Sequence, residues 1–108
     1  MDFVQAIYKL TGTIPKEDYG LTSKLRLSAV SIPSNIAEGA ARNTDKEFLN
    51  FIHIAQGSAA EAETQLLIAQ RLDYYRNVEP VLSGLRTVQK LLHGIMRHYK
   101  AKRMKSDV

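Results

Sequence analysis

Apolar residues recur at intervals of three and four along almost the whole chain, and this spacing constrains the fold more than any other feature. It places apolar side chains on one face of an α-helix, whereas a half-buried strand requires strict alternation. No segment shows a convincing alternation. Because the segments with helical spacing are joined by short connections, sequential helices should pack as antiparallel neighbours. We therefore predict an all-α, antiparallel, up-down four-helix bundle with helices at about residues 2–11, 16–42, 44–72 and 78–98.

Local signals set the boundaries of these helices. Gly12 ends the first helix, and Pro15 suits the first turn of the second. Thr44 and Glu47 have the spacing of a capping box, so Thr44 is the predicted N-cap of the third helix. Pro33 lies in the middle of the second helix and removes one backbone hydrogen bond, which predicts a kink or a local break there.

The length of the chain, 108 residues, corresponds to a single domain with its own core. We place the four-helix bundle at residues 1–100 and a basic, frayed tail at residues 101–108. The first helix should span roughly 15 Å and the second roughly 39 Å, so the first cannot cover the groove between its longer neighbours. We expect either that the native protein begins further upstream or that another subunit covers exposed apolar surface.

Composition excludes several classes of function. There is no cysteine, which rules out disulfides, thiolate metal sites and thiol catalysis. No apolar run approaches the length of a membrane span, and the N-terminus lacks the pattern of a signal peptide. No glutamate is followed by histidine three residues later, as the di-iron bundles require. We therefore expect a cytoplasmic protein with no metal, no cofactor and no membrane contact.

Positive charge is concentrated toward the C-terminus. The net charge is +4, and from Leu85 onward seven basic residues are accompanied by Asp107 alone among the acidic residues. Such an end is typical of a protein that binds a polyanion and also of an ordinary solubilising tail. Contacts of Lys and Arg with phosphates are sequence-tolerant. The candidate nucleic-acid-binding residues are Arg86, Lys90, Arg97, Lys100, Lys102, Arg103 and Lys105.

A second group of polar residues follows one flank of the predicted second helix and faces polar residues of the third. One interpretation is an anion or nucleotide site built from Lys24 and Arg42. The interpretation that we favour is a hydrogen-bonded seam that fixes helix register or a subunit contact. We call this group the polar seam, and it consists of Lys24, Ser28, Ser31, Asn35, Glu38 and Arg42 with Ser58, Glu61 and Gln65.

One enzymatic alternative comes from Arg86 and His93, which lie seven residues apart. This spacing is similar to the Arg-x(4–6)-His motif of the helical HEPN ribonucleases, in which His could act in acid–base catalysis and Arg could hold phosphate. The spacing arises easily by chance in a basic helix, so a ribonuclease is a remote alternative. No other pair of nucleophile and base can be argued, and we predict that the protein is not an enzyme.

The middle of the chain resembles one bacterial family, the four-helix-bundle 23S ribosomal RNA intervening-sequence proteins. The resemblance covers about residues 6–75, and its most specific part is the string Ser-Ile-Pro-Ser-Asn-Ile-Ala-Glu-Gly. Roughly the first half of the family's first helix has no counterpart here. The segments that carry the resemblance are residues 19–23, 30–39, 46–49 and 54–58.

The resemblance implies a ring-shaped homo-oligomer, because similar proteins assemble as pentamers. A relative, the accessory protein of diversity-generating retroelements, is a basic pentamer that binds nucleic acid and a reverse transcriptase. Together with the basic C-terminal region, this leads us to expect a non-enzymatic, pentameric bundle that binds RNA or DNA. A protein-binding scaffold without nucleic acid is the alternative.

Overall fold

The computed structural model describes residues 2–13, 19–74 and 78–106, with the backbone alone at residues 103–106. These residues form four α-helices and no strand, which confirms the all-α, four-helix prediction. The helices are α1 (Asp2–Thr11), α2 (Tyr19–Ala40), α3 (Asp45–Arg71) and α4 (Glu79–Ser106).

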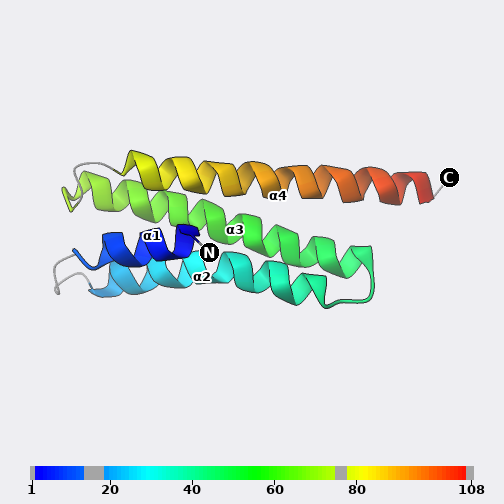
Figure 1. Cartoon of the computed structure of the whole chain (residues 1–108), viewed down its shortest axis with the longest axis horizontal. Helices are drawn as coiled ribbons and strands as arrows, with labels where there is room; N and C mark the ends of the chain where they lie inside the picture. The colour runs from blue at the N-terminus through cyan, green and yellow to red at the C-terminus, as the bar shows by residue number, and fades with distance from the viewer. Residues whose placement is uncertain (1, 14–18, 75–77, 107–108) are drawn as a thin grey trace.

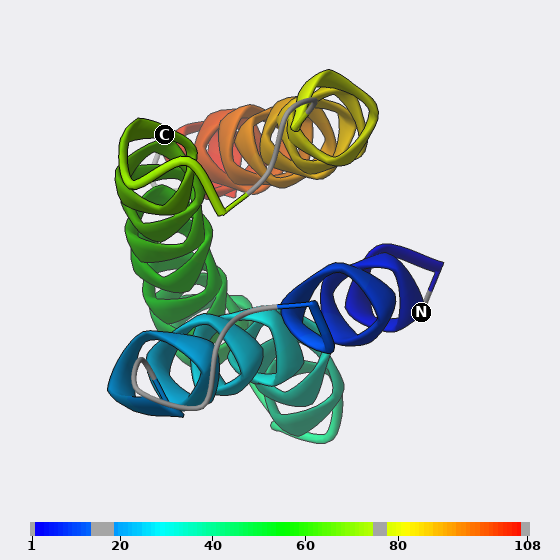
Figure 2. The same cartoon turned by 90° about the vertical axis from the view of Figure 1, so that its left-hand side faces the viewer.

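The four helices surround one core and form a molecule of 54 × 22 × 19 Å (Figure 1). The colour gradient in Figure 1 shows that chain direction alternates from each helix to the next. Viewed nearly along the long axis, the helices follow one another around the core in sequence order (Figure 2). The most extensive packing is between α2 and α3, while α4 packs on α3, and α1 packs on α2 and contacts α4. Among the described residues, α2 does not approach α4 closely, nor α1 α3.

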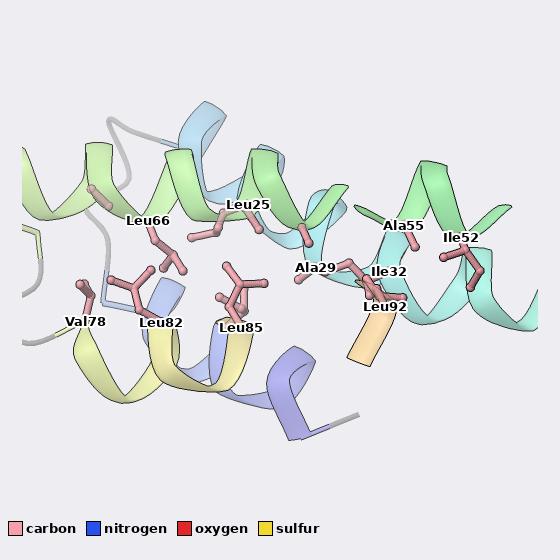
Figure 3. Close-up of a cluster of buried hydrophobic side chains, with 14 of the residues drawn as sticks. Leu25, Ala29, Ile32, Ile52, Ala55, Leu66, Val78, Leu82, Leu85 and Leu92 are labelled. Atoms are coloured by element: carbon pink, nitrogen blue, oxygen red, sulfur yellow. The ribbon is translucent and has the colours of Figure 1, made fainter. Parts of the chain in front are cut away.

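Among the described residues, the core contains sixteen apolar side chains that are each at most 4 % exposed. On α3, the apolar residues at helical spacing form one stripe that is buried except for the half-buried Phe48. The stripe consists of Phe48, Ile52, Ala55, Ala59, Ala62, Leu66 and Ala69. Figure 3 shows Leu66 of α3 and Leu82 of α4 pointing toward one another across the core. The helical spacing of apolar residues therefore identified the faces of the long helices that pack together.

Two predicted local features, the N-cap at Thr44 and the interruption at Pro33, can be compared with the structure. Thr44 is the N-cap of α3, since its hydroxyl oxygen accepts the backbone N–H of Glu47 at 3.2 Å. Helix α2 continues through Pro33, so the predicted local break is wrong, whereas a kink there stays a prediction. The predicted start of this helix near Lys16 lies outside the described residues.

The fourth helix is longer than predicted. It was expected to end near His98, but α4 continues through the segment predicted as a frayed tail as far as Ser106. Residues 99–106 contain neither Gly nor Pro, and their several Lys and Arg residues favour the negative end of the helix dipole. Residues 107 and 108 lie outside the described part of the chain.

The short α1 is fastened to the bundle by a few specific contacts. Ile7 is completely buried. The guanidinium of Arg26 on α2 donates a hydrogen bond from Nε to Thr11 Oγ1 at 2.7 Å and lies 4.5 Å from the centre of the Tyr8 ring. The Thr11 hydroxyl in turn donates to the Ile7 carbonyl at 2.7 Å. One side chain of α2 thus holds two consecutive turns of α1.

The expectation that a short first helix leaves apolar surface exposed is only partly correct. Toward the α2–α3 turn, where α1 is absent, Ile32 and Leu92 are still buried, although Ile36 and Ile95 are half-buried. Larger apolar exposure occurs on outward faces of the bundle. The exposed large apolar and aromatic side chains are Tyr8, Tyr19, Leu27, Val30, Ile54, Leu67, Ile68, Leu72 and Leu91.

Candidate nucleic-acid interface

Helix α4 carries a line of mostly basic residues beside its apolar face. The residues follow one another at spacings of four, three, four and three, so they occupy a sector of about 80° around the helix. All of them are exposed. We call this line the basic row, and it consists of Arg86, Lys90, His93, Arg97 and Lys100.

The orientation of α4 is fixed by its other two sides. Leu85 and Leu92 are buried in the core. On the side toward α3, the Tyr99 ring packs edge-on against Phe48 with the ring centres 5.1 Å apart. The basic row lies on one of the exposed flanks of α4, turned away from α3. Core packing of α4 therefore leaves the row accessible to a large ligand.

The row forms a shallow surface and not an enclosed pocket. Four of its members and Gln89 line one open hollow of about 580 Å³. All of these lining residues come from α4 itself. A hollow lined by a single helix does not exclude water from a reacting group, as enclosed active sites do. The shape suits contact with an extended ligand better than catalysis.

The basic residues of the row differ in whether their charges are already paired within the protein. Arg86 Nη1 lies 3.6 Å from Glu79 Oε2, in the first turn of α4, and both side chains are more than half exposed. Exposed ion pairs of this kind are weak, at about 0–1 kcal/mol, so Arg86 can still exchange partners. Among the described residues, Lys90, Arg97 and Lys100 form no ion pair.

The structure divides the seven predicted nucleic-acid-binding residues into groups. Arg86, Lys90, Arg97 and Lys100 lie together in the basic row. Lys102 lies on the opposite side of α4, where its Nζ is 3.4 Å from Asp45 Oδ2 and 5.7 Å from the centre of the Tyr99 ring.

Lys102 therefore does not belong to this surface, because its position is about 160° around the helix from that of Arg86. The side chains of Arg103 and Lys105 lie outside the described residues. His93 and Gln89 were not among the predicted binding residues, although the four-and-three spacing would have identified His93.

Two parts of the polar seam form hydrogen bonds. The hydroxyls of Ser31 on α2 and Ser58 on α3 lie 2.8 Å apart, and Asn35 Nδ2 donates to the Ser31 carbonyl at 2.8 Å and to its hydroxyl at 2.9 Å. At the end of α2, Arg42 Nη2 donates to Glu38 Oε1 at 2.7 Å. Of these contacts, the Ser31–Ser58 pair joins α2 to α3, and the others connect residues four positions apart along the chain.

The alternative anion site at Lys24 and Arg42 is wrong as a shared site. The two residues are 18 positions apart, equivalent to about 27 Å along a helix, and Arg42 pairs with Glu38. Lys24, Glu61 and Gln65 instead border two open hollows of about 670 and 490 Å³ along the α2–α3 groove. Gln65 Oε1 is buried there without a hydrogen-bond partner.

For the ribonuclease alternative, the structure brings Arg86 and His93 to one surface but adds no second acid–base group there among the described residues. Arg86 and His93 both line the hollow on α4, about 10.5 Å apart along the axis. No second acid–base group from another helix lines this hollow.

Within the described ranges, no group of three His, Cys, Asp or Glu residues could hold a metal ion. No helix in the described part of the chain is long and apolar enough to cross a membrane.

Comparison with known proteins gives one family. The family model described as 23S rRNA-intervening sequence protein matches residues 1–94. This range includes α1, α2, α3 and the first part of α4, with the basic row as far as His93. None of the curated proteins is significantly similar to the chain.

Proposed function

Because the chain belongs to the 23S rRNA-intervening sequence protein family, we propose that it is a non-enzymatic, homo-oligomeric bundle that binds nucleic acid through the basic row of α4. The basic row is the observation that carries this proposal. It sets at least four formal positive charges on one exposed flank of a single rigid helix. Such a line of cations attracts phosphate groups and gains affinity from the release of their counterions.

The chemistry of the row supports binding without base recognition. Lys and Arg contact phosphates without reading sequence, and Tyr99, the aromatic residue nearest to the row's end, packs against Phe48. Sequence-tolerant binding of RNA or DNA is therefore the activity that fits this surface. Within the row, His93 contributes an imidazole ring.

Homo-oligomer formation is supported by apolar surface outside the core. Four exposed apolar and aromatic residues are among the seven that line one hollow of about 360 Å³ on the outer side of α1 and α2, and Leu27 among them is 71 % exposed. Apolar clusters on a surface commonly mark sites of protein association. We call this cluster the outer patch, and it consists of Tyr8, Tyr19, Leu27 and Val30. The pentameric stoichiometry rests on the family resemblance.

The experiment for nucleic-acid binding compares two double variants of the full-length protein. Lys90→Gln with Arg97→Gln removes two charges of the row, whereas Lys24→Gln with Lys46→Gln removes two charges from α2 and α3. We expect wild-type binding of a labelled oligonucleotide to weaken steeply between about 50 and 200 mM salt. The row variant should bind more weakly than both wild type and the control variant.

Other outcomes would contradict or redirect the assignment. Absence of binding at low salt, or equal loss in both double variants, would contradict the proposed nucleic-acid surface. A partner protein retained at high salt without nucleic acid would favour the scaffold alternative, which the outer patch also suits. Cleavage of single-stranded RNA that is lost in His93→Ala would establish the ribonuclease alternative and contradict the non-enzymatic assignment.

A further inference from the structure

We propose that the nucleic acid on the basic row is a single strand, bound along its phosphate backbone parallel to α4, and not a double helix. This inference rests on the proposed function and specifies its ligand. It follows from the shape of the row, from the charge on the other sides of α4, and from the path of a strand in a duplex.

The row is straight and evenly spaced. Arg86 and Lys100 are fourteen residues apart, so the row extends about 21 Å, and neighbouring members are separated by about 4.5–6 Å along the axis. Helix α4 is uninterrupted over this length and appears as one straight rod (Figure 1). An extended single strand can follow such a line and place one phosphate near each basic side chain.

A strand within a duplex cannot follow the same line. One turn of the double helix takes about 34 Å, so a strand rotates through more than half a turn over the length of the row. Its phosphates therefore leave a straight row after a short contact. A duplex can also receive a helix in its major groove, which is about 12 Å wide and is bordered by phosphates of both strands.

Over the length of the row, α4 lacks the second line of cations that such a groove would require. Alongside the row, about 120° around the helix from it, residues 84–98 include a strip that contains no Lys, Arg, Asp or Glu, and its Leu91 is 62 % exposed; Lys105, at a similar angle, comes seven residues after His98 and beyond the end of the row. The third side packs against α3 through Tyr99 and Lys102. We call the second side the uncharged strip, and it consists of Gly84, Thr87, Leu91, Gly94 and His98.

The ends of the row limit how much of a strand it contacts. Glu79 lies two turns before Arg86 on the same flank, where its carboxylate would repel a phosphate. The strand should therefore bind between Arg86 and Lys100, with about four phosphates near Lys or Arg. No Phe, Tyr or Trp belongs to the row. The bases of the bound strand should therefore project away from α4 without stacking on aromatic side chains.

The experiment measures binding of fluorescein-labelled ligands to the full-length protein by anisotropy. The ligands are a 20-nucleotide oligouridylate, the corresponding oligothymidylate, and a 20-base-pair duplex of mixed sequence. We expect both single strands to bind about tenfold more tightly than the duplex at the same salt concentration. For a single strand, the slope of log K against log salt should become shallower by about 1.4 in the Lys90→Gln, Arg97→Gln variant.

The controls separate this inference from the proposed function. The slope of the Lys24→Gln, Lys46→Gln variant should match wild type. Duplex binding as tight as single-strand binding, with both dependent on the row, would overturn the single-strand inference and leave the proposed function in place. No binding of any ligand, or an unchanged slope in the row variant, would overturn both.

Discussion

At the scale of single residues, Gly39, near the end of α2, is the glycine with the closest neighbours on another helix. A Cβ atom at this position would lie 2.8 Å from Phe51 Cβ and 3.0 Å from Phe48 Cδ1. Phe51 Cβ is attached directly to the backbone of α3 and cannot move away without shifting the helix. Glycine at position 39 therefore sets the distance between α2 and α3 beside their connecting turn.

We predict that Gly39→Ala destabilises the protein despite the higher helix propensity of alanine. Overpacking of a filled interface costs about 1–3 kcal/mol, which exceeds the gain of about 1 kcal/mol from replacing a helical glycine. Urea unfolding followed by circular dichroism measures the difference.

The matched control is Gly57→Ala, in the middle of α3. A Cβ at Gly57 would meet no atom within 4 Å, so this substitution should stabilise the isolated chain by up to about 1 kcal/mol. Equal effects of the two substitutions would show that the close approach at Gly39 does not determine the packing of α2 on α3.

A second prediction concerns the hydroxyl pair that joins α2 to α3. Ser31→Ala and Ser58→Ala should each destabilise the bundle by about 1 kcal/mol, because each leaves the other hydroxyl without this partner. A double-mutant cycle should give a coupling free energy of about 0.5–1 kcal/mol. Strict additivity would mean that the bond contributes nothing. Thr64→Ala, which removes an exposed hydrogen bond within α3, serves as the control.

At the scale of elements, α1 is the helix with the weakest independent support. It has ten residues, and helices of this length are marginal in water unless tertiary contacts hold them. Its anchors are the buried Ile7 and the contacts of Arg26 with Thr11 and Tyr8. Ordering of α1 therefore depends on residues of α2.

We predict that Arg26→Ala loosens α1 while the three long helices remain folded. The substitution removes a hydrogen bond and a cation–π contact, which together contribute about 1–3 kcal/mol. Hydrogen exchange should accelerate at the amides of α1 and remain slow in the middle of α3.

Lys24→Ala is the control for this prediction, since Lys24 lies on the same helix and forms no ion pair among the described residues. Its exchange pattern should equal that of wild type. If Arg26→Ala leaves α1 protected, Ile7 and the apolar contacts of α1 hold this helix without the guanidinium.

At the scale of the whole molecule, two surfaces of different chemistry lie on different helices. The basic row follows one flank of α4, while the outer patch lies on α1 and α2. Because the two surfaces do not share residues, association between subunits through the outer patch would leave the row free to bind phosphates. The proposed oligomer and the proposed ligand are therefore compatible.

We predict that Leu27→Glu converts the oligomer to a species near the chain mass of 12.1 kDa. A carboxylate in the outer patch would have to be buried on association, and burial of a charge is strongly unfavourable unless it is fully paired. The neighbouring guanidinium of Arg26 is already engaged by Thr11 and Tyr8. Light scattering after size exclusion measures the mass. Circular dichroism should remain that of wild type because Leu27 is 71 % exposed in the single chain.

Thr87→Glu introduces the same charge at an exposed position of α4 and should leave the mass unchanged. A wild-type protein that is monomeric at micromolar concentration would contradict the proposed oligomer. An oligomer that survives Leu27→Glu would place the subunit contact elsewhere on the surface.

The sequence alone determined the number, type and inward faces of the helices. Apolar spacing identified the buried stripe of α3, and the capping-box pair located the start of that helix at Thr44. These features are local, because helix periodicity and capping depend on residues within a few turns of one another. Even locally the end of α4 was missed, since no Gly or Pro marks it before Ser106.

Only the tertiary structure decided which of the polar residues act together. Lys102 counted as one of seven basic candidates in the sequence, but packing of α4 on α3 turns it toward Asp45 and away from the basic row. Lys24 and Arg42 shared a predicted flank, yet the length of α2 keeps them apart. The flank of a helix that remains exposed depends on its neighbours, and those neighbours lie far away in the sequence.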